Sequence, residues 1–272
     1  MKIKLGVDVG GSTTKIVGVT ESGEPIGMLQ VRAADQVTSL YGALGRFLQE
    51  QSLTLQQIER IYLTGVGAGF FSDFIYGIPV TKVDEFTAIG RGALKLTGMN
   101  RAYVVSIGTG SAFVRASESG VTRVGGSGVG GGTLVGLSYL LLREENISRV
   151  SELAYLGDAG NIDLLVGAIS PQDIPELPAH ATAANFGNVN PTSGREEMAF
   201  ALINMVMQTV GMLAVFATLN DPDAIRDVIL IGSAALVPQC RDVMDAITQL
   251  TGIRFTIPPD APYATAIGTI NS

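Results

Sequence analysis

The stretch Leu5-Gly-Val-Asp-Val-Gly-Gly-Ser-Thr-Thr-Lys-Ile-Val17 decides the fold. Apolar, β-forming residues flank a short run of Gly, Ser and Thr, which predicts a strand, a tight turn and a second strand. A similar stretch, Tyr103-Val-Val-Ser-Ile-Gly-Thr-Gly-Ser-Ala-Phe-Val114, occurs further along the chain. Because small residues let backbone N–H groups approach an anion closely, the two turns together predict a clamp around a polyphosphate.

Either turn taken alone is equally typical of a purely structural hairpin. The spacing matches neither the Walker A loop, which needs Gly-Lys-Ser/Thr, nor the dinucleotide fingerprint that opens a helix. Two hairpins that hold phosphate from opposite sides are typical of actin-like, sugar-kinase-like and Hsp70-like ATPases. The sequence therefore predicts an α/β protein with the two-lobed, actin-like (ribonuclease H-like) ATPase fold. In that fold mixed sheets are flanked by helices, and ATP lies in the cleft between the lobes.

Length and composition bound the class of protein. The chain has 272 residues, of which 46% are hydrophobic and 16% charged, so it can bury a core and is not a disordered chain. No uninterrupted apolar run reaches the length of a membrane span, and the first strand leaves no room for a signal peptide. The single cysteine excludes an intrachain disulfide, which fits a cytoplasmic protein. The net charge of −7, without a basic run, argues against nucleic acid as a partner.

The expected elements divide the chain into two lobes, residues 1–100 and 101–272. In the first lobe we expect strands at 3–9, 14–20, 26–32, 58–64 and 79–83, and helices at 36–51 and 85–97. In the second we expect strands at 102–107, 111–117, 121–125, 161–166, 227–231 and 253–257, and helices ending near 143 and spanning 148–157, 198–219, 236–251 and 264–270. The last helix is expected to return to the first lobe.

Asp8 and Lys15 flank the first turn. A carboxylate at the end of a strand suits Mg²⁺ held through water, because Mg²⁺ keeps much of its hydration shell. The alternative is a turn carboxylate that caps nearby amides. Lys15 is placed to reach a β- or γ-phosphate as a point charge, and its alternative is an exposed strand lysine.

The second turn, Gly108-Thr109-Gly110, offers the Thr109 hydroxyl and amide as phosphate donors. A glycine run precedes the following helix, and a helix N-terminus of this kind binds anions or ribose well. Ser233 ends a late strand where an adenine pocket would close, although a helix N-cap explains it equally well. The resulting nucleotide-binding candidates are Asp8, Val9, Gly10, Gly11, Ser12, Thr13, Thr14, Lys15, Thr109, Gly131, Gly132, Thr133, Leu134, Val135 and Ser233.

Phosphoryl transfer to an alcohol often needs a carboxylate that takes the hydroxyl proton. The pair Asp84-Glu85, between a strand and a helix, is the best candidate, and by position either residue can be the base. Its alternative is a charged first helical turn favoured by the helix dipole. Arg123 precedes the glycine run and is a candidate for binding substrate oxygens, with a solvent-facing arginine as the alternative. The single histidine, His180, is interpreted as exposed and without a role.

These motifs resemble the type II pantothenate kinases. The first turn, Asp8 to Lys15, is similar to that family's Asp-x-Gly-Gly-Thr-x-x-Lys, with Ser12 as a conservative departure. Other matching segments are Val83–Ala88, Ile107–Ser111, Arg123–Gly132, Leu153–Asp158, Ala183–Gly187 and Ile231–Ser233. The match spans nearly the whole chain; the arginine–glycine stretch and Ala-Asn-Phe-Gly are its most specific parts.

The resemblance implies ATP-dependent phosphorylation of pantothenate at its primary hydroxyl, with Mg²⁺ as the metal. It selects Glu85 over Asp84 as the base and gives Arg123 the tasks of holding pantothenate and neutralising charge. Pantothenamides are further candidate acceptors. The resemblance also implies a homodimer, for which the apolar helix 198–219 is the candidate interface; a buried interlobe helix is the alternative.

Three other functions compete with this reading. An N-acetylhexosamine or ROK-type sugar kinase of the same superfamily usually has an aspartate base, and one Cys with one His cannot build the zinc site of many ROK members. An activator of radical dehydratases needs cysteines for an iron–sulfur cluster, and only Cys240 is present. A non-catalytic actin-like regulator would bind nucleotide without transferring phosphate.

Overall fold

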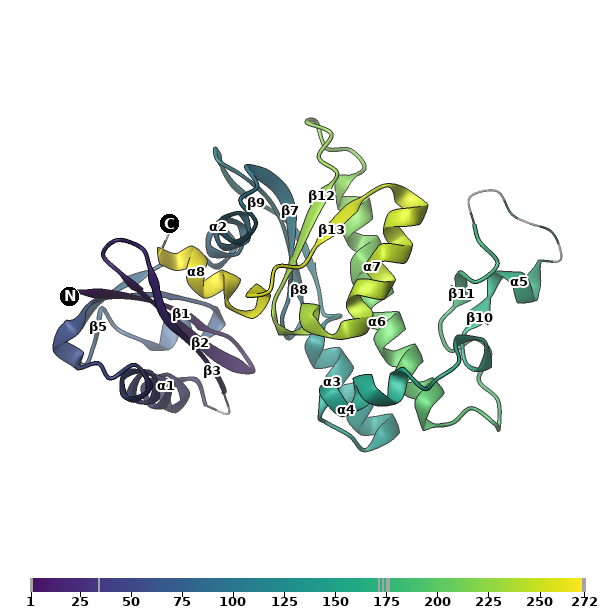
Figure 1. Cartoon of the computed structure of the whole chain (residues 1–272), viewed down its shortest axis with the longest axis horizontal. Coiled ribbons are helices and arrows are strands. Elements are labelled where there is room, and N and C mark those ends of the chain that lie inside the picture. The colour runs from purple at the N-terminus through teal and green to yellow at the C-terminus, as the bar shows by residue number, and fades with distance from the viewer. Residues whose placement is uncertain (1, 34, 171, 173, 175–176, 271–272) are drawn as a thin grey trace.

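Two large β-sheets with flanking helices and one small two-stranded sheet make up the described part of the protein (Figure 1). The computed structural model describes residues 2–33, 35–170, 172, 174 and 177–270. The first sheet has the strand order β3-β2-β1-β4-β6-β5 and the second β13-β12-β7-β8-β9. The strands of the first sheet are β1 (Ile3–Val9), β2 (Thr13–Thr20), β3 (Pro25–Arg32), β4 (Ile58–Thr64), β5 (Phe74–Ile75) and β6 (Ile78–Lys82). Those of the second are β7 (Arg101–Ile107), β8 (Ser111–Ser117), β9 (Gly120–Ser127), β12 (Asp227–Ile231) and β13 (Arg254–Thr256).

Helices cover both sheets, and most begin where the sequence placed them. They are α1 (Gln36–Glu50), α2 (Glu85–Thr97), α3 (Gly131–Leu142), α4 (Ile147–Ala154), α5 (Val166–Ile169), α6 (Arg195–Thr218), α7 (Pro238–Thr251) and α8 (Ala264–Ile270). In α1 the side chain of Asp35 caps the helix by accepting a hydrogen bond from the Thr38 amide. Leu40, Leu44 and Phe47 recur on one face and are buried against β2 and β3. The helix therefore closes one side of the first sheet.

The long apolar helix α6 is a core helix of the second lobe. It packs against α3, α4, α7 and β7, which all come from residues after 100. Among the residues that the structure describes, it is the one helix long and apolar enough to cross a membrane. Yet 61% of its apolar 18-residue stretch is buried inside the fold. Its composition is thus explained by burial. The alternative of a helix buried between the lobes does not describe it.

Helices α2 and α8 lie side by side between the two sheets (Figure 1). Helix α2 packs on β7, β8 and β9, whereas α8 packs on β1 and β4 of the first sheet, where the last helix was expected. The helices touch through glycine: a Cβ on Gly92 would overlap the Ala264 carbonyl, and one on Gly268 would overlap that of Ala88. We propose residues 1–100 and 101–272 as the lobes, with these two helices crossing from one lobe to the other.

The segment after α4 differs from the sequence prediction. The strand expected at 161–166 is confirmed only at β10 (Leu164–Leu165), and α5 follows it directly. The short β10 pairs with β11 (Thr182–Ala184), a strand that was not predicted. Next to β10, the buried carboxylate of Asp163 accepts hydrogen bonds from the Phe186 amide and the Asn204 side chain. These long-range contacts override the local pattern. In the loop that follows, Pro171 and Pro175 lie outside the described residues.

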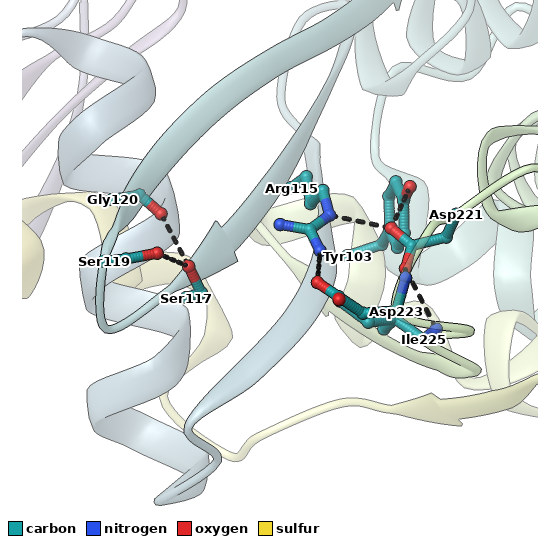
Figure 2. A network of polar contacts seen from close by, with 8 residues as sticks. All are labelled: Tyr103, Arg115, Ser117, Ser119, Gly120, Asp221, Asp223 and Ile225. Atoms are coloured by element: carbon teal, nitrogen blue, oxygen red, sulfur yellow. Dashed lines mark hydrogen bonds and ion pairs between the residues drawn. The ribbon is translucent and has the colours of Figure 1, made fainter.

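A buried carboxylate ties the loop after α6 to the second sheet (Figure 2). Asp221 accepts hydrogen bonds from the Tyr103 hydroxyl at 2.8 Å and from Arg115 Nε at 2.7 Å. Arg115 also pairs with Asp223, and the amides of Asp223 and Ile225 donate to Asp221. Burial opposes ionisation of Asp221, but the bonds from Arg115, Tyr103 and the two amides lower its pKa below the ordinary value. Burial and the bond to Asp221 raise the pKa of Tyr103 to about 12.

This network predicts an acid-sensitive contribution to stability. We expect Asp221→Asn to lower the Tm at pH 7, because the variant removes the ionised partner of Arg115. The folded-state pKa of Asp221 is depressed, so its contribution is present above its unfolded pKa of about 3.9 and is lost as the pH falls further. The difference in Tm between wild type and variant should therefore shrink below about pH 4. Thermal unfolding followed by circular dichroism between pH 3 and pH 7 checks this, and a constant difference would contradict it.

Candidate active site

A cleft of about 1190 Å³ lies between the lobes, and both glycine-rich turns line it. The turns touch: Ser12 Oγ and Thr109 Oγ1 are 3.0 Å apart, although they stand 97 residues apart in the sequence. A second polar contact between the lobes joins Ser233 Oγ to Gln30 Oε1 at 3.4 Å. Two turns from separate sheets thus face one space, which is the arrangement that a clamp on one polyphosphate requires.

Asp8 and Lys15 face each other across the first hairpin. They are register partners in the β1–β2 pair, and Lys15 Nζ lies 3.5 Å from Asp8 Oδ2, with both side chains buried. Burial raises the pKa of Asp8 above its ordinary value, and the ammonium of Lys15 lowers it in part. Gly65, at the end of β4, has φ +92°, and a Cβ there would come within 2.7 Å of Asp8 Oδ1. Glycine at this position therefore leaves the carboxylate its space.

Strand alternation separates the candidates of the first turn. Gly10, Gly11, Ser12 and Thr13 line the cleft together with Asp8 and Lys15. Val9 and Thr14 are completely buried and do not line it, because successive strand residues point to opposite faces. The Thr14 hydroxyl has no hydrogen-bond partner. The side chains of Val9 and Thr14 belong to the core of the first lobe.

The glycine run before α3 braces the second turn. The amide of Gly131 donates to the Gly108 carbonyl, and that of Gly132 donates to the Thr109 carbonyl, each at 2.8 Å. These two amides, expected to face an anion, are therefore satisfied within the protein. The Thr133 hydroxyl donates to the Gly128 carbonyl and Thr133 does not line the cleft.

The remaining nucleotide candidates lie at the wall of the cleft. Gly131, Gly132, Leu134, Val135 and Ser233 all contribute to its lining, and Leu134 is completely buried. Ser233 does not cap a helix: Gly232 occupies the N-cap of the short turn that follows.

At the start of α2, Asp84 caps the helix and Glu85 faces the cleft. Asp84 is the N-cap, and its carboxylate accepts from the amide and the hydroxyl of Thr87 at 2.8 and 2.9 Å. Glu85 lines the cleft. Burial, with the carboxylates of Asp8 and Asp84, raises the pKa of Glu85 above its ordinary value, and Lys15 lowers it in part. A carboxylate of raised pKa in a cleft is suited to proton transfer near neutral pH.

Arg123 reaches the same cleft from β9. Its guanidinium carbon lies 5.2 Å from the centroid of the Phe86 ring. Phe86 directly follows Glu85 in the chain, and Arg123 and Phe86 both line the cleft. Sequence reasoning placed Arg123 as a ligand but missed this neighbour, because nothing local in the sequence brings β9 over the start of α2.

Other lining residues were also missed. Arg32 ends β3, Glu145 lies in the loop between α3 and α4, and Ile147 begins α4. No sequence motif marks these positions. Only the packing of distant elements around one cleft could have shown their place.

Solved structures share this architecture. Component A of (R)-2-hydroxyglutaryl-CoA dehydratase from Acidaminococcus fermentans superposes with a TM-score of 0.69 at 16% identity, covering 99% of this chain and 96% of that one. A putative N-acetylglucosamine kinase from Chromobacterium violaceum gives a TM-score of 0.55 at 16% identity, covering 99% of both chains. With its paired lobes and interlobe cleft, the protein has the two-lobed fold of the actin-like ATPases.

Sequence comparison gives the family within this class. The family model Fumble matches residues 101–249. A type II pantothenate kinase from Staphylococcus aureus (strain USA300) is 30% identical over 281 residues, covering 98% of this chain and 98% of that protein. The relative from the bovine strain RF122/ET3-1 has the same identity and coverage. The chain belongs to the type II pantothenate kinase family.

Proposed function

We propose that this protein transfers the γ-phosphoryl group of ATP to the primary hydroxyl of pantothenate, giving 4'-phosphopantothenate in the first step of coenzyme A synthesis. Membership of the type II pantothenate kinase family supports the acceptor. The observation that carries the chemistry is the cleft itself. It brings Glu85, whose pKa is raised, together with Arg123 and two glycine-rich turns.

The residues of the cleft divide the work of the transfer. The acceptor oxygen attacks the γ-phosphorus, the bond from that phosphorus to the bridging oxygen breaks, and ADP leaves. Glu85 takes the hydroxyl proton. Arg123 binds acceptor or phosphoryl oxygens through its planar N–H donors. Lys15 and the amides of the first turn hold the β- and γ-phosphates. Lys15 then pairs with phosphate, which carries more charge than its present partner, the Asp8 carboxylate.

The donor set of the cleft fits Mg²⁺. Among the described residues no group of three or more His, Cys, Asp or Glu could form a closed metal cage. A single buried carboxylate, Asp8, suits an ion that keeps its water and takes phosphate oxygens as ligands. We propose that Asp8 holds Mg²⁺ through water, and that the bound ion neutralises charge on the phosphates.

The proposal includes an assembly and a location. We propose a homodimer formed at the end of α6, where Leu213, Phe216 and Leu219 are exposed on an otherwise buried helix. A protein that sediments as a monomer at micromolar concentration would contradict it.

A kinase that consumes ATP draws on the cytoplasmic nucleotide pool, so we propose a cytoplasmic location.

An acceptor panel tests the proposed reaction. We expect the purified protein with MgATP to release ADP in the presence of pantothenate or N-substituted pantothenamides, and not with glucose or N-acetylglucosamine. A coupled ADP assay measures this, and mass spectrometry identifies the phosphorylated product. Turnover with the sugars alone would indicate a sugar kinase. ATP binding without turnover of any acceptor would indicate a nucleotide-binding regulator.

A further inference from the structure

Arg123 carries its charge without an anionic partner. Among the described residues no carboxylate lies within ion-pair distance of its guanidinium, whereas Arg115, on the neighbouring strand, is paired with Asp221 and Asp223. What Arg123 contacts is an aromatic face: Phe86, at 5.2 Å from the guanidinium carbon to the ring centroid. A cation over a ring is held by the ring's quadrupole without being neutralised.

An irregularity in β9 aims Arg123 at this ring. In the β8–β9 pair, Val114 stands opposite Arg123 and Phe113 opposite Gly125, so Val124 is the extra residue of a β-bulge. Val114 belongs to the core that packs on α2, and residues directly opposite each other share a face of the sheet. Arg123 therefore lies on the α2 side, where Phe86 occupies the first turn.

Gly126 also lies close to the guanidinium of Arg123. A Cβ on Gly126 would lie 3.7 Å from Arg123 Nη2 and 3.2 Å from the Ser111 carbonyl oxygen. The first distance is an ordinary van der Waals contact, whereas the second is tight, so a larger residue there would press on β8. Arg123 thus has glycine backbone near its guanidinium and contacts a ring that is partly buried against the α2 core.

We propose that Phe86 is a positioning residue that holds the guanidinium of Arg123 by its face and so directs its N–H edge into the cleft beside Glu85. A phenyl ring has no acceptor oxygen, so the contact with Phe86 leaves the five N–H donors of the guanidinium available for a carboxylate or phosphoryl group. A carboxylate partner in place of the ring would occupy those donors and cancel the charge. The inference rests on the proposed function, because it assigns Arg123 an anionic ligand in that reaction.

The kinetic test replaces the ring and keeps its bulk. We expect Phe86→Leu to lower kcat/KM for pantothenate by about 3- to 30-fold, the range that a cation–π contact supports, while Phe86→Tyr, which keeps the ring, stays near wild type. In the background of Arg123→Met, which removes the cation, the further loss from Phe86→Leu should be much smaller than in wild type, because both changes remove the same contact.

The pH at which kcat falls on the acid side (the acid limb of kcat) separates a positioning role of Phe86 from a merely structural one. The raised pKa of Glu85 comes from its burial, Asp8 and Asp84, so Phe86→Leu should leave that limb in place. A limb that moves, or losses that simply add in the double variant, would mean that the ring acts by packing around Glu85, and would overturn the proposal.

The matched control is a second cation–π pair. Arg143 lies 5.5 Å from the Tyr139 ring, and neither residue lines the cleft. Tyr139→Leu removes a contact of the same kind at a similar distance, and we expect it to leave kcat/KM unchanged.

A spectroscopic measurement makes the inference independent of turnover. In protein labelled selectively at arginine, the side-chain resonances of Arg123, assigned with Arg123→Lys, should be shifted upfield by the ring current of Phe86. The shift should persist in Phe86→Tyr and Tyr139→Leu and disappear in Phe86→Leu. An unshifted Arg123 in wild type would overturn the proposal even if pantothenate is phosphorylated. A shifted Arg123 without pantothenate turnover would count against the proposed function alone.

Discussion

Replacing Glu85 with glutamine is expected to lower kcat for pantothenate phosphorylation by at least about 100-fold, while the protein still folds and binds ATP. Glutamine keeps the size and polarity of the side chain but cannot take the proton. In wild type the base must be deprotonated, so kcat should fall on the acid side at a pH above the ordinary pKa of a glutamate, because burial, Asp8 and Asp84 raise the pKa of Glu85. Steady-state kinetics from pH 5 to pH 9 measure both effects.

Asp84→Asn is the matched control for this prediction. Asparagine is as good an N-cap as aspartate, so α2 should keep its first turn. Removing the Asp84 charge lowers the pKa of Glu85, which should move the acid limb of kcat to lower pH and leave the plateau nearly unchanged. Near-normal kinetics in Glu85→Gln, or a larger loss in Asp84→Asn, would show that Glu85 is not the base.

Gly92→Ala is expected to destabilise the protein more than any surface change. A Cβ at Gly92 would overlap the Ala264 carbonyl oxygen, which belongs to the backbone of α8 and cannot rotate away. The two helices must then separate. We expect the free energy of unfolding to fall by about 3 kcal/mol, at the upper end of overpacking effects. At roughly 2–4 °C per kcal/mol, the Tm falls by about 6–12 °C.

The control is a glycine with open space around it. Gly45 lies within α1, is exposed, and has nothing within 4 Å of an added Cβ. Gly45→Ala should raise stability by about 0.5–1 kcal/mol, because alanine loses less backbone entropy than glycine on entering a helix. Thermal and urea unfolding compare the two variants. Equal effects of both substitutions would refute the close crossing of α2 and α8.

Features that depend on neighbouring residues could be predicted from the sequence. The hairpin around Gly10 was predicted, and it places Asp8 opposite Lys15 by simple register. Val9 and Thr14 were predicted to bind nucleotide, whereas strand alternation places both side chains in the core. The cap and first turn at Asp84 and Glu85 follow from helix chemistry in the same way. These parts of the candidate site were accessible because short-range geometry decides them.

Features decided by distant packing could not be predicted. The stack of Arg123 on Phe86 depends on a bulge at Val124 and on how α2 crosses the second sheet. The amides of Gly131 and Gly132 look available in the sequence, but the carbonyls of the second turn engage them. The strand predicted at 161–166 forms only at Leu164–Leu165, where it pairs with β11, a strand about 20 residues further along that the sequence did not predict.

The place of α8 has a consequence for synthesis on the ribosome. This helix packs directly on β1: a Cβ at Gly6 would overlap the Ala266 carbonyl, so β1 packs against a helix that is synthesised much later. The roughly 180 residues between β6 and α8 take on the order of ten seconds or more to translate. Throughout that time the flank of the first sheet that α8 covers in the folded protein is exposed.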